Sequence, residues 1–152
     1  MATDPSFLSR RNFAVGGCCA AVAAGLSHAA LAKTDSIGGL VRMLFGEKDF
    51  EEGRVRLNVP EIAENGMVVP VSVEVESPMT ETSYVRSIHL YALDNPVPQV
   101  GAYIFTPASG RAAISTRIRL AKTQDLIAVA EMSDGTVHAS KAPIKVVIGG
   151  CE

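Results

Sequence analysis

The sequence predicts an all-β fold, an immunoglobulin-like β-sandwich of about seven strands, with a short N-terminal helix before it and a flexible C-terminal arm after it. Hydrophobic residues recur at helical spacing over residues 36–46, where Gly46 favours a helix stop. From residue 54 onward the hydrophobic pattern has a period of two, which is typical of half-buried strands. Turn residues separate these runs at roughly 8–12-residue spacing, as in a sandwich of short strands.

The clearest strand is the run from Val69 to Val75, where a valine occupies every second position. Two dipeptides, Asn65-Gly66 and Asp134-Gly135, favour type I′ turns because both positions tolerate positive φ, and each predicts a hairpin. Further turns are predicted at Asp94-Asn95-Pro96 and over residues 107–110. The predicted strands are residues 54–59, 69–76, 86–93, 100–105, 113–120, 126–132 and 137–148.

The N-terminal residues 1–32 have the three parts of an export signal. Arg10 and Arg11 form a twin-arginine pair, residues 14–26 are weakly apolar, and Ala30-Leu31-Ala32 offers a small-residue cleavage site. The apolar run is too short to span a bilayer, which takes about 20 residues. We therefore expect export of the folded protein by the twin-arginine route into the oxidising bacterial periplasm. The alternatives are a short buried helix and lipidation at Cys18.

Residues 33–147 are enough for one domain with its own hydrophobic core, without need of disulfides. The formal net charge of the whole chain is −2, and the chain has no block of basic residues. Nucleic acid is therefore a disfavoured partner. No second long apolar run follows the leader, so no stable membrane span is expected.

The predicted sandwich has no catalytic residues that we recognise. His89 and His138 are each isolated on a predicted strand, and we interpret both as ordinary surface or sheet histidines rather than metal ligands. The acidic residues over 47–52 are interpreted as a solvated face. The sequence has no glycine-rich phosphate loop and no Cys-x-x-Cys pair. We therefore expect no metal, no cofactor and no enzymatic activity of the chain itself.

The chemistry concentrates on Cys151, one residue before the end. With the leader removed, it is the one thiol left, since Cys18 and Cys19 lie within residues 1–32. Gly149 and Gly150 precede it, so residues 148–152 are predicted to form a mobile arm. The arm would reach roughly 10–13 Å from Gly149, or about 20 Å if the chain frays from Val146. A lone thiolate can form a sulfur–sulfur bond that a second nucleophile later breaks.

Six segments together extend over essentially the whole chain after the leader. They are Ser77-Pro78-Met79-Thr80, Tyr84-Val85-Arg86-Ser87-Ile88-His89, Thr106-Pro107-Ala108-Ser109-Gly110-Arg111, Ser115-Thr116-Arg117-Ile118-Arg119-Leu120, Ala130-Glu131-Met132-Ser133-Asp134-Gly135 and Ile148-Gly149-Gly150-Cys151. With these segments the chain resembles the SoxY family, the sulfur-carrier subunits of the bacterial thiosulfate-oxidising Sox system.

The resemblance implies an immunoglobulin-like domain that forms a heterodimer with a second β-sandwich subunit, SoxZ. It implies that Cys151 carries the pathway intermediates covalently while three enzymes visit the arm. Of these, SoxAX, a haem enzyme, would join thiosulfate to the thiol, and SoxB, a hydrolase, would release sulfate. SoxCD would oxidise the remaining sulfur. The chain itself would be a periplasmic carrier and not an enzyme.

Two other functions remain open at this point. The chain could be a structural or assembly protein that forms a permanent intermolecular disulfide through Cys151. It could also be a Sox-like carrier that serves a different periplasmic oxidation. The identity of the adduct on Cys151 distinguishes the three functions.

The ending Cys151-Glu152 departs from the family pattern, in which two glycines follow the cysteine. The Glu152 carboxylate and the terminal carboxylate place two negative charges beside the sulfur, which disfavours a third. We expect the pKa of the Cys151 thiol to lie above its ordinary value of about 8.5. Glu152→Gly should lower this pKa, more at low ionic strength than at high. The pH dependence of alkylation by iodoacetamide measures it, and an equal or higher pKa in the variant would refute the charge argument.

Overall fold

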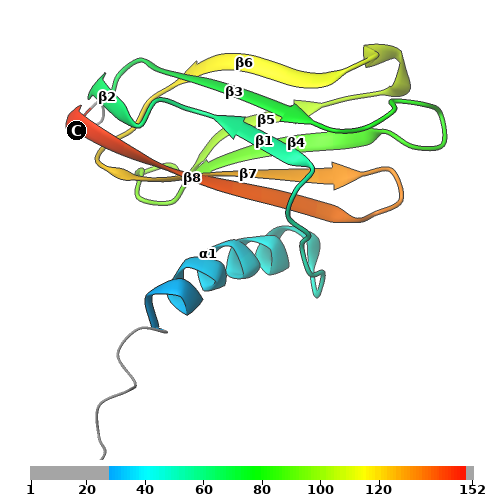
Figure 1. The fold of residues 1–152 in the computed structure, drawn as a ribbon, viewed down its shortest axis with the longest axis horizontal. Coiled ribbons are helices and arrows are strands. Elements are labelled where there is room, and N and C mark those ends of the chain that lie inside the picture. Colours follow the sequence, from blue (N-terminus) through cyan, green and yellow to red (C-terminus); the bar gives the residue numbers. More distant parts are fainter. Residues whose placement is uncertain (1–27, 150–152) are drawn as a thin grey trace, which may run out of the picture.

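The computed structural model describes residues 28–149, with side chains from Ile37 onward. Two β-sheets pack face to face, and one helix lies against the outside of the larger sheet (Figure 1). The elements are α1 (His28–Phe45), β1 (Val55–Asn58), β2 (Ile62–Asn65), β3 (Val69–Val75), β4 (Val85–Ala92), β5 (Gln99–Ile104), the 3-10 turn η1 (Pro107–Ser109), β6 (Ala112–Ile118), β7 (Gln124–Met132) and β8 (Val137–Ile148).

The smaller sheet has the strand order β1-β3-β6, and the larger sheet has the order β2-β8-β7-β4-β5. All neighbouring strands are antiparallel except β2 and β8, which pair in parallel. The inward side chains of both sheets form one core, in which Val71, Leu90 and Leu126 are almost fully buried. The predicted all-β fold with two packed sheets is confirmed, with eight strands among the described residues rather than about seven.

The predicted hairpin at Asn65-Gly66 is wrong. β1 and β3 are antiparallel partners, with Val55 opposite Val75, but the chain between them crosses to the other sheet and forms β2. The sequence gives little sign of β2, because it has four residues and buries only Ala63. Asn65 instead ends β2, where its side chain accepts a hydrogen bond from the Met67 amide at 2.8 Å.

The predicted hairpin at Asp134-Gly135 is confirmed, although its turn is longer than two residues. β7 and β8 pair on either side of it, and the Met132 amide donates to the Thr136 carbonyl at 2.9 Å. Gly135 has a φ of 84°, whereas Asp134 is not among the residues with positive φ. This geometry is that of a turn closed by one left-handed glycine rather than of a type I′ pair.

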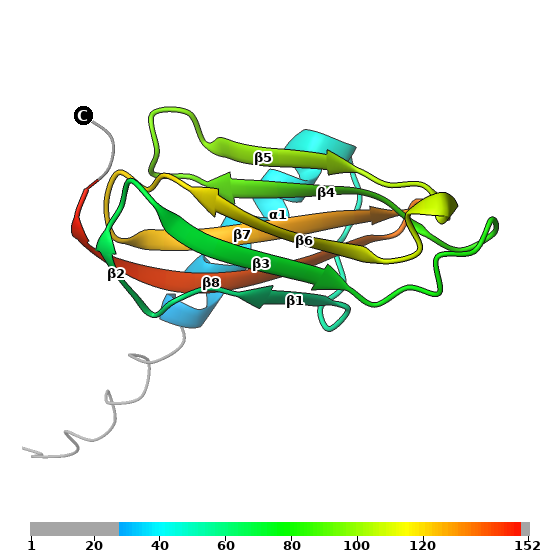
Figure 2. The ribbon, with the colours of Figure 1, turned by 90° about the horizontal axis from the view of Figure 1, so that it is seen from above.

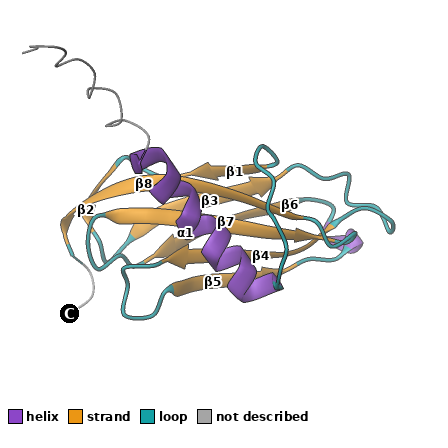
Figure 3. Ribbon diagram, turned by 90° about the horizontal axis from the view of Figure 1, so that it is seen from below, coloured by secondary structure: helices purple, strands orange, loops and turns teal. Residues whose placement is uncertain are grey.

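Helix α1 begins at His28, eight residues before the predicted start, and thus includes the predicted cleavage site at residues 30–32. It ends where predicted, since Gly46 has a φ of 78° and its amide donates to the Arg42 carbonyl. Ile37, Leu40 and Val41 pack on the outer face of the larger sheet (Figure 3). No helix of the described residues is long and apolar enough to cross a membrane.

Two buried amides, Asn95 and Gln124, fix the loops at the end of the sandwich where β8 finishes (Figure 2). The Asn95 side chain donates to the Arg119 carbonyl at 2.8 Å and accepts from the Ala121 amide at 2.9 Å. Gln124 donates to Asn95 Oδ1 at 2.9 Å and accepts from the Asp94 amide. The β4–β5 loop thereby holds the β6–β7 loop in place.

Asn95→Ala should lower the free energy of unfolding by about 2–3 kcal/mol, because it leaves buried polar groups of the β6–β7 loop without partners. Asn58→Ala is the matched control, since Asn58 is exposed and its removal should change stability by less than about 0.5 kcal/mol. Urea unfolding at equilibrium measures both values. Equal stability of the two variants would show that the network does not hold the loop.

Candidate functional site: the root of the C-terminal arm

The last residues of β8 are hydrogen-bonded to two other segments. The Ile148 carbonyl accepts from the Gly66 amide at 2.7 Å, and the Gly66 carbonyl accepts from the Leu120 amide, also at 2.7 Å. Ile148 is the parallel partner of Asn65 on β2. The end of β8, the end of β2 and the β6–β7 loop are therefore joined at one place, which we call the arm root.

The Thr123 side chain binds β8 at Val146, two residues before Ile148. Thr123 Oγ1 accepts from the Val146 amide at 2.9 Å and donates to the Val146 carbonyl at 3.3 Å. With these contacts, β8 is paired through Ile148, so Ile148 belongs to the strand rather than to the arm. The structure thus favours the shorter of the two reaches expected from the sequence, the one that starts at Gly149 and extends roughly 10–13 Å.

Gly149 lies directly against the β6–β7 loop. A Cβ added at this residue would come 2.2 Å from the Ala121 carbonyl oxygen and 3.3 Å from the Ala121 carbonyl carbon. Both atoms belong to the backbone, in a loop whose Ala121 amide is already bound by Asn95. Glycine is needed here for a close approach of two backbones. The sequence had suggested a different role for this glycine, the mobility of the arm.

The other residues predicted to take part lie outside the described residues. These are Gly150 and Cys151 of the arm, and Arg10 and Arg11 of the leader. Gly149 is thus the member of the predicted site that the structure places. Sequence reasoning missed the residues that hold it, Ala121, Thr123 and Gly66, because their contribution is made largely by backbone groups from distant segments.

His89 lies on β4 beneath the end of α1, where its ring packs edge-on against Phe45 at 6.0 Å and stacks on Tyr91 at 6.5 Å. Its Nε2 is 3.1 Å from Ser87 Oγ. Burial lowers the pKa of His89, and the nearby charge of Glu131 partly opposes this. These contacts give His89 a packing role under the helix, as expected of a sheet histidine.

His138 is a sheet histidine on β8, as expected, but its side chain is buried rather than on the surface. It is 2% exposed, and its Nδ1 has no hydrogen-bond partner. The Glu51 carboxylate lies 3.8 Å from Nδ1, on a segment that pairs with β8 through the Glu51 amide and carbonyl. Among the described side chains, no group of three or more His, Cys, Asp or Glu could hold a metal ion.

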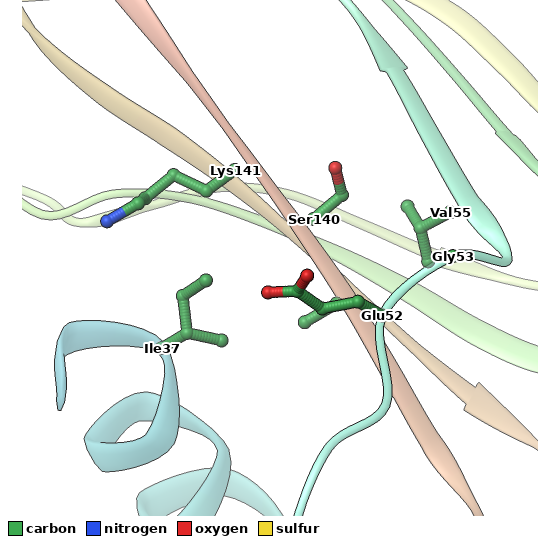
Figure 4. Close-up of a pocket in the computed structure, with 7 residues that line it drawn as sticks. Ile37, Glu52, Gly53, Val55, Ser140 and Lys141 are labelled. Atoms are coloured by element: carbon green, nitrogen blue, oxygen red, sulfur yellow. The ribbon is translucent and has the colours of Figure 1, made fainter. Parts of the chain in front are cut away.

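A cavity of about 420 Å³ lies between α1, the segment before β1 and the first half of β8 (Figure 4). Ile37, Glu52, Ser140 and Lys141 line it, and Lys141 also forms an ion pair with Asp125 at 3.4 Å. On β8 this cavity is eight residues away from Gly149, so it is separate from the arm root.

Comparison with known proteins identifies the family. The model of the family "Sulfur oxidation protein SoxY" matches residues 41–151. Among solved structures, the sulfur carrier protein SoxY from Chlorobium limicola f thiosulfatophilum is 28% identical, with a TM-score of 0.60. The match covers 74% of this chain and 96% of that one.

A superoxide reductase (neelaredoxin) from Ignicoccus hospitalis is 21% identical with a TM-score of 0.55, over 62% of this chain and 80% of that one, and shares the fold alone. No match was found among curated proteins. The family match extends over most of the chain and includes the arm root, so this protein belongs to the SoxY family of sulfur oxidation proteins.

Proposed function

We propose that this protein is a periplasmic sulfur carrier that holds thiosulfate-derived intermediates covalently on Cys151. The observation that carries the proposal is the arm root, which holds the chain in place as far as Gly149 and leaves Cys151 two residues further on. Membership of the SoxY family supports it, as does the likeness to a solved sulfur carrier. The role requires no catalytic group within the domain.

The strand order supports an immunoglobulin-like domain. The strands β1, β3 and β6 correspond to the A, B and E strands of that fold, and β8, β7 and β4 correspond to its G, F and C strands.

For the domain's location, the twin-arginine pattern at Arg10-Arg11 supports export in the folded state. Folded export would allow a SoxZ-like subunit, bound before export, to reach the periplasm with this chain.

The proposed chemistry begins with a two-electron oxidation at Cys151. The thiol loses its proton, Sγ bonds to the outer sulfur of thiosulfate, and the two electrons pass to a haem enzyme of the SoxAX type. A SoxB-like hydrolase then adds water across the bond between the outer sulfur and the sulfonate group. Sulfate leaves, and a persulfide remains on Cys151 for a SoxCD-like enzyme to oxidise. The carrier keeps its own sulfur throughout.

Cys151→Ser should abolish the adduct without unfolding the domain, because the residue lies beyond the last strand. Intact mass spectrometry of protein from thiosulfate-grown cells should show one added thiosulfate or sulfane sulfur on the wild-type chain. The variant should show neither and keep the wild-type circular dichroism spectrum. A disulfide-linked dimer as the sole modified form of the wild type would instead support the structural function.

Gly149→Ala should slow enzymatic loading of Cys151 about tenfold or more, because the added carbon displaces the arm root from Ala121. Alkylation by iodoacetamide, which needs no docking, should proceed at the wild-type rate. Gly39→Ala is the matched control, since nothing lies within 4 Å of a Cβ added there. Equal loading rates for the wild type and both variants would refute the positioning role of Gly149.

A further inference from the structure

The large hydrophobic side chains that the domain exposes are unevenly distributed. Nine are exposed among the described residues, and six of them lie at the end of the sandwich that holds the arm root. We call these six the apolar collar. They are Met67 and Val68 in the β2–β3 turn, Leu93 and Val97 in the β4–β5 loop, and Val147 and Ile148 at the end of β8.

The collar lies beside the arm root. Its three segments meet there because Gly66 is bonded to Ile148, and because Asn95 of the β4–β5 loop binds the β6–β7 loop on which Gly149 lies. Figure 2 shows these loops together at the end where β8 finishes. The collar residues are between 41% and 70% exposed. Apolar side chains gathered in this way on a protein surface mark interaction sites.

The short separation between Gly149 and Cys151 indicates what covers the collar. Cys151 lies two residues beyond Gly149, and two extended residues with the cysteine side chain reach roughly 10 Å. An enzyme that acts on the Cys151 sulfur must therefore bring the mouth of its active site within about that distance of Gly149. At that separation the surface around the mouth lies against the collar.

We propose that the apolar collar is the docking surface for the enzymes that act on Cys151, and that these enzymes have an apolar rim around the active-site entrance. This proposal rests on the proposed carrier function. A permanently bound subunit fits the collar less well, because it would also cover the arm root. Burial of apolar side chains on both sides would supply binding energy that the short link from Gly149 to Cys151 alone cannot give.

The test uses the carrier in its complex with the partner subunit, and the loading enzyme purified by its thiosulfate-dependent activity on Cys151. The double variant Met67→Ser/Val97→Ser removes two collar side chains from different loops. Ile104→Ser is the matched control, because Ile104 is 85% exposed but lies at the opposite end of β5 from Val97. Loading is followed as the rate of mass addition to Cys151 at increasing carrier concentration.

The double variant should raise the KM for the carrier about tenfold and leave kcat within about twofold, since docking is lost and the thiol is unchanged. The control should keep the wild-type KM, and all three proteins should react equally with iodoacetamide. An unchanged KM in the double variant, or an equal rise in the control, would overturn the proposal. So would release of the partner subunit by the double variant alone. Failure of the wild type to load would instead refute the carrier function.

Discussion

The close approach of Gly149 to the Ala121 carbonyl is the constraint on which the site depends. A side chain at residue 149 would require a backbone carbonyl to move, because even the first side-chain carbon would lie 2.2 Å from it. The loop that carries this carbonyl is held by Asn95 from one side and bonded to Gly66 from the other. Gly66 in turn holds Ile148, so each contact at the root supports the next.

This arrangement means that the β-domain fixes the position of the chain at Gly149. The core lies between the two sheets, and the buried amides of Asn95 and Gln124 bond the β4–β5 loop to the β6–β7 loop. In the proposed carrier function, a short link between the fixed root and Cys151 limits where the thiol can go, which favours delivery into a partner's active site over random collisions. The same shortness requires close contact between domain and enzyme, and the exposed side chains of the collar are suited to such contact.

Much of the fold could be predicted from the sequence, because alternating valines and turn residues are local signals. The run in β3 and the turn at Gly135 show this. β2 was missed because one buried side chain in four residues leaves no period to detect. The prediction of a hairpin at Asn65-Gly66 was wrong because a dipeptide favours a turn but does not determine which strands pair. His138 bridges to Glu51, which is far from it in the sequence, so no local pattern predicts its burial.

For the site, the sequence singled out Gly149 for the mobility of the arm, and the structure adds a second reason for glycine there, the close approach to Ala121. Its neighbour Ala121 is distant in sequence and contributes a backbone carbonyl, which no residue type signals. The central claim is that the chain stays fixed through the arm root, and amide hydrogen exchange of Gly66 tests it most directly, because this amide donates to Ile148. We predict that Gly66 is protected as strongly as Leu120 and Val146. Exchange of Gly66 at the rate of an unprotected amide would contradict the account.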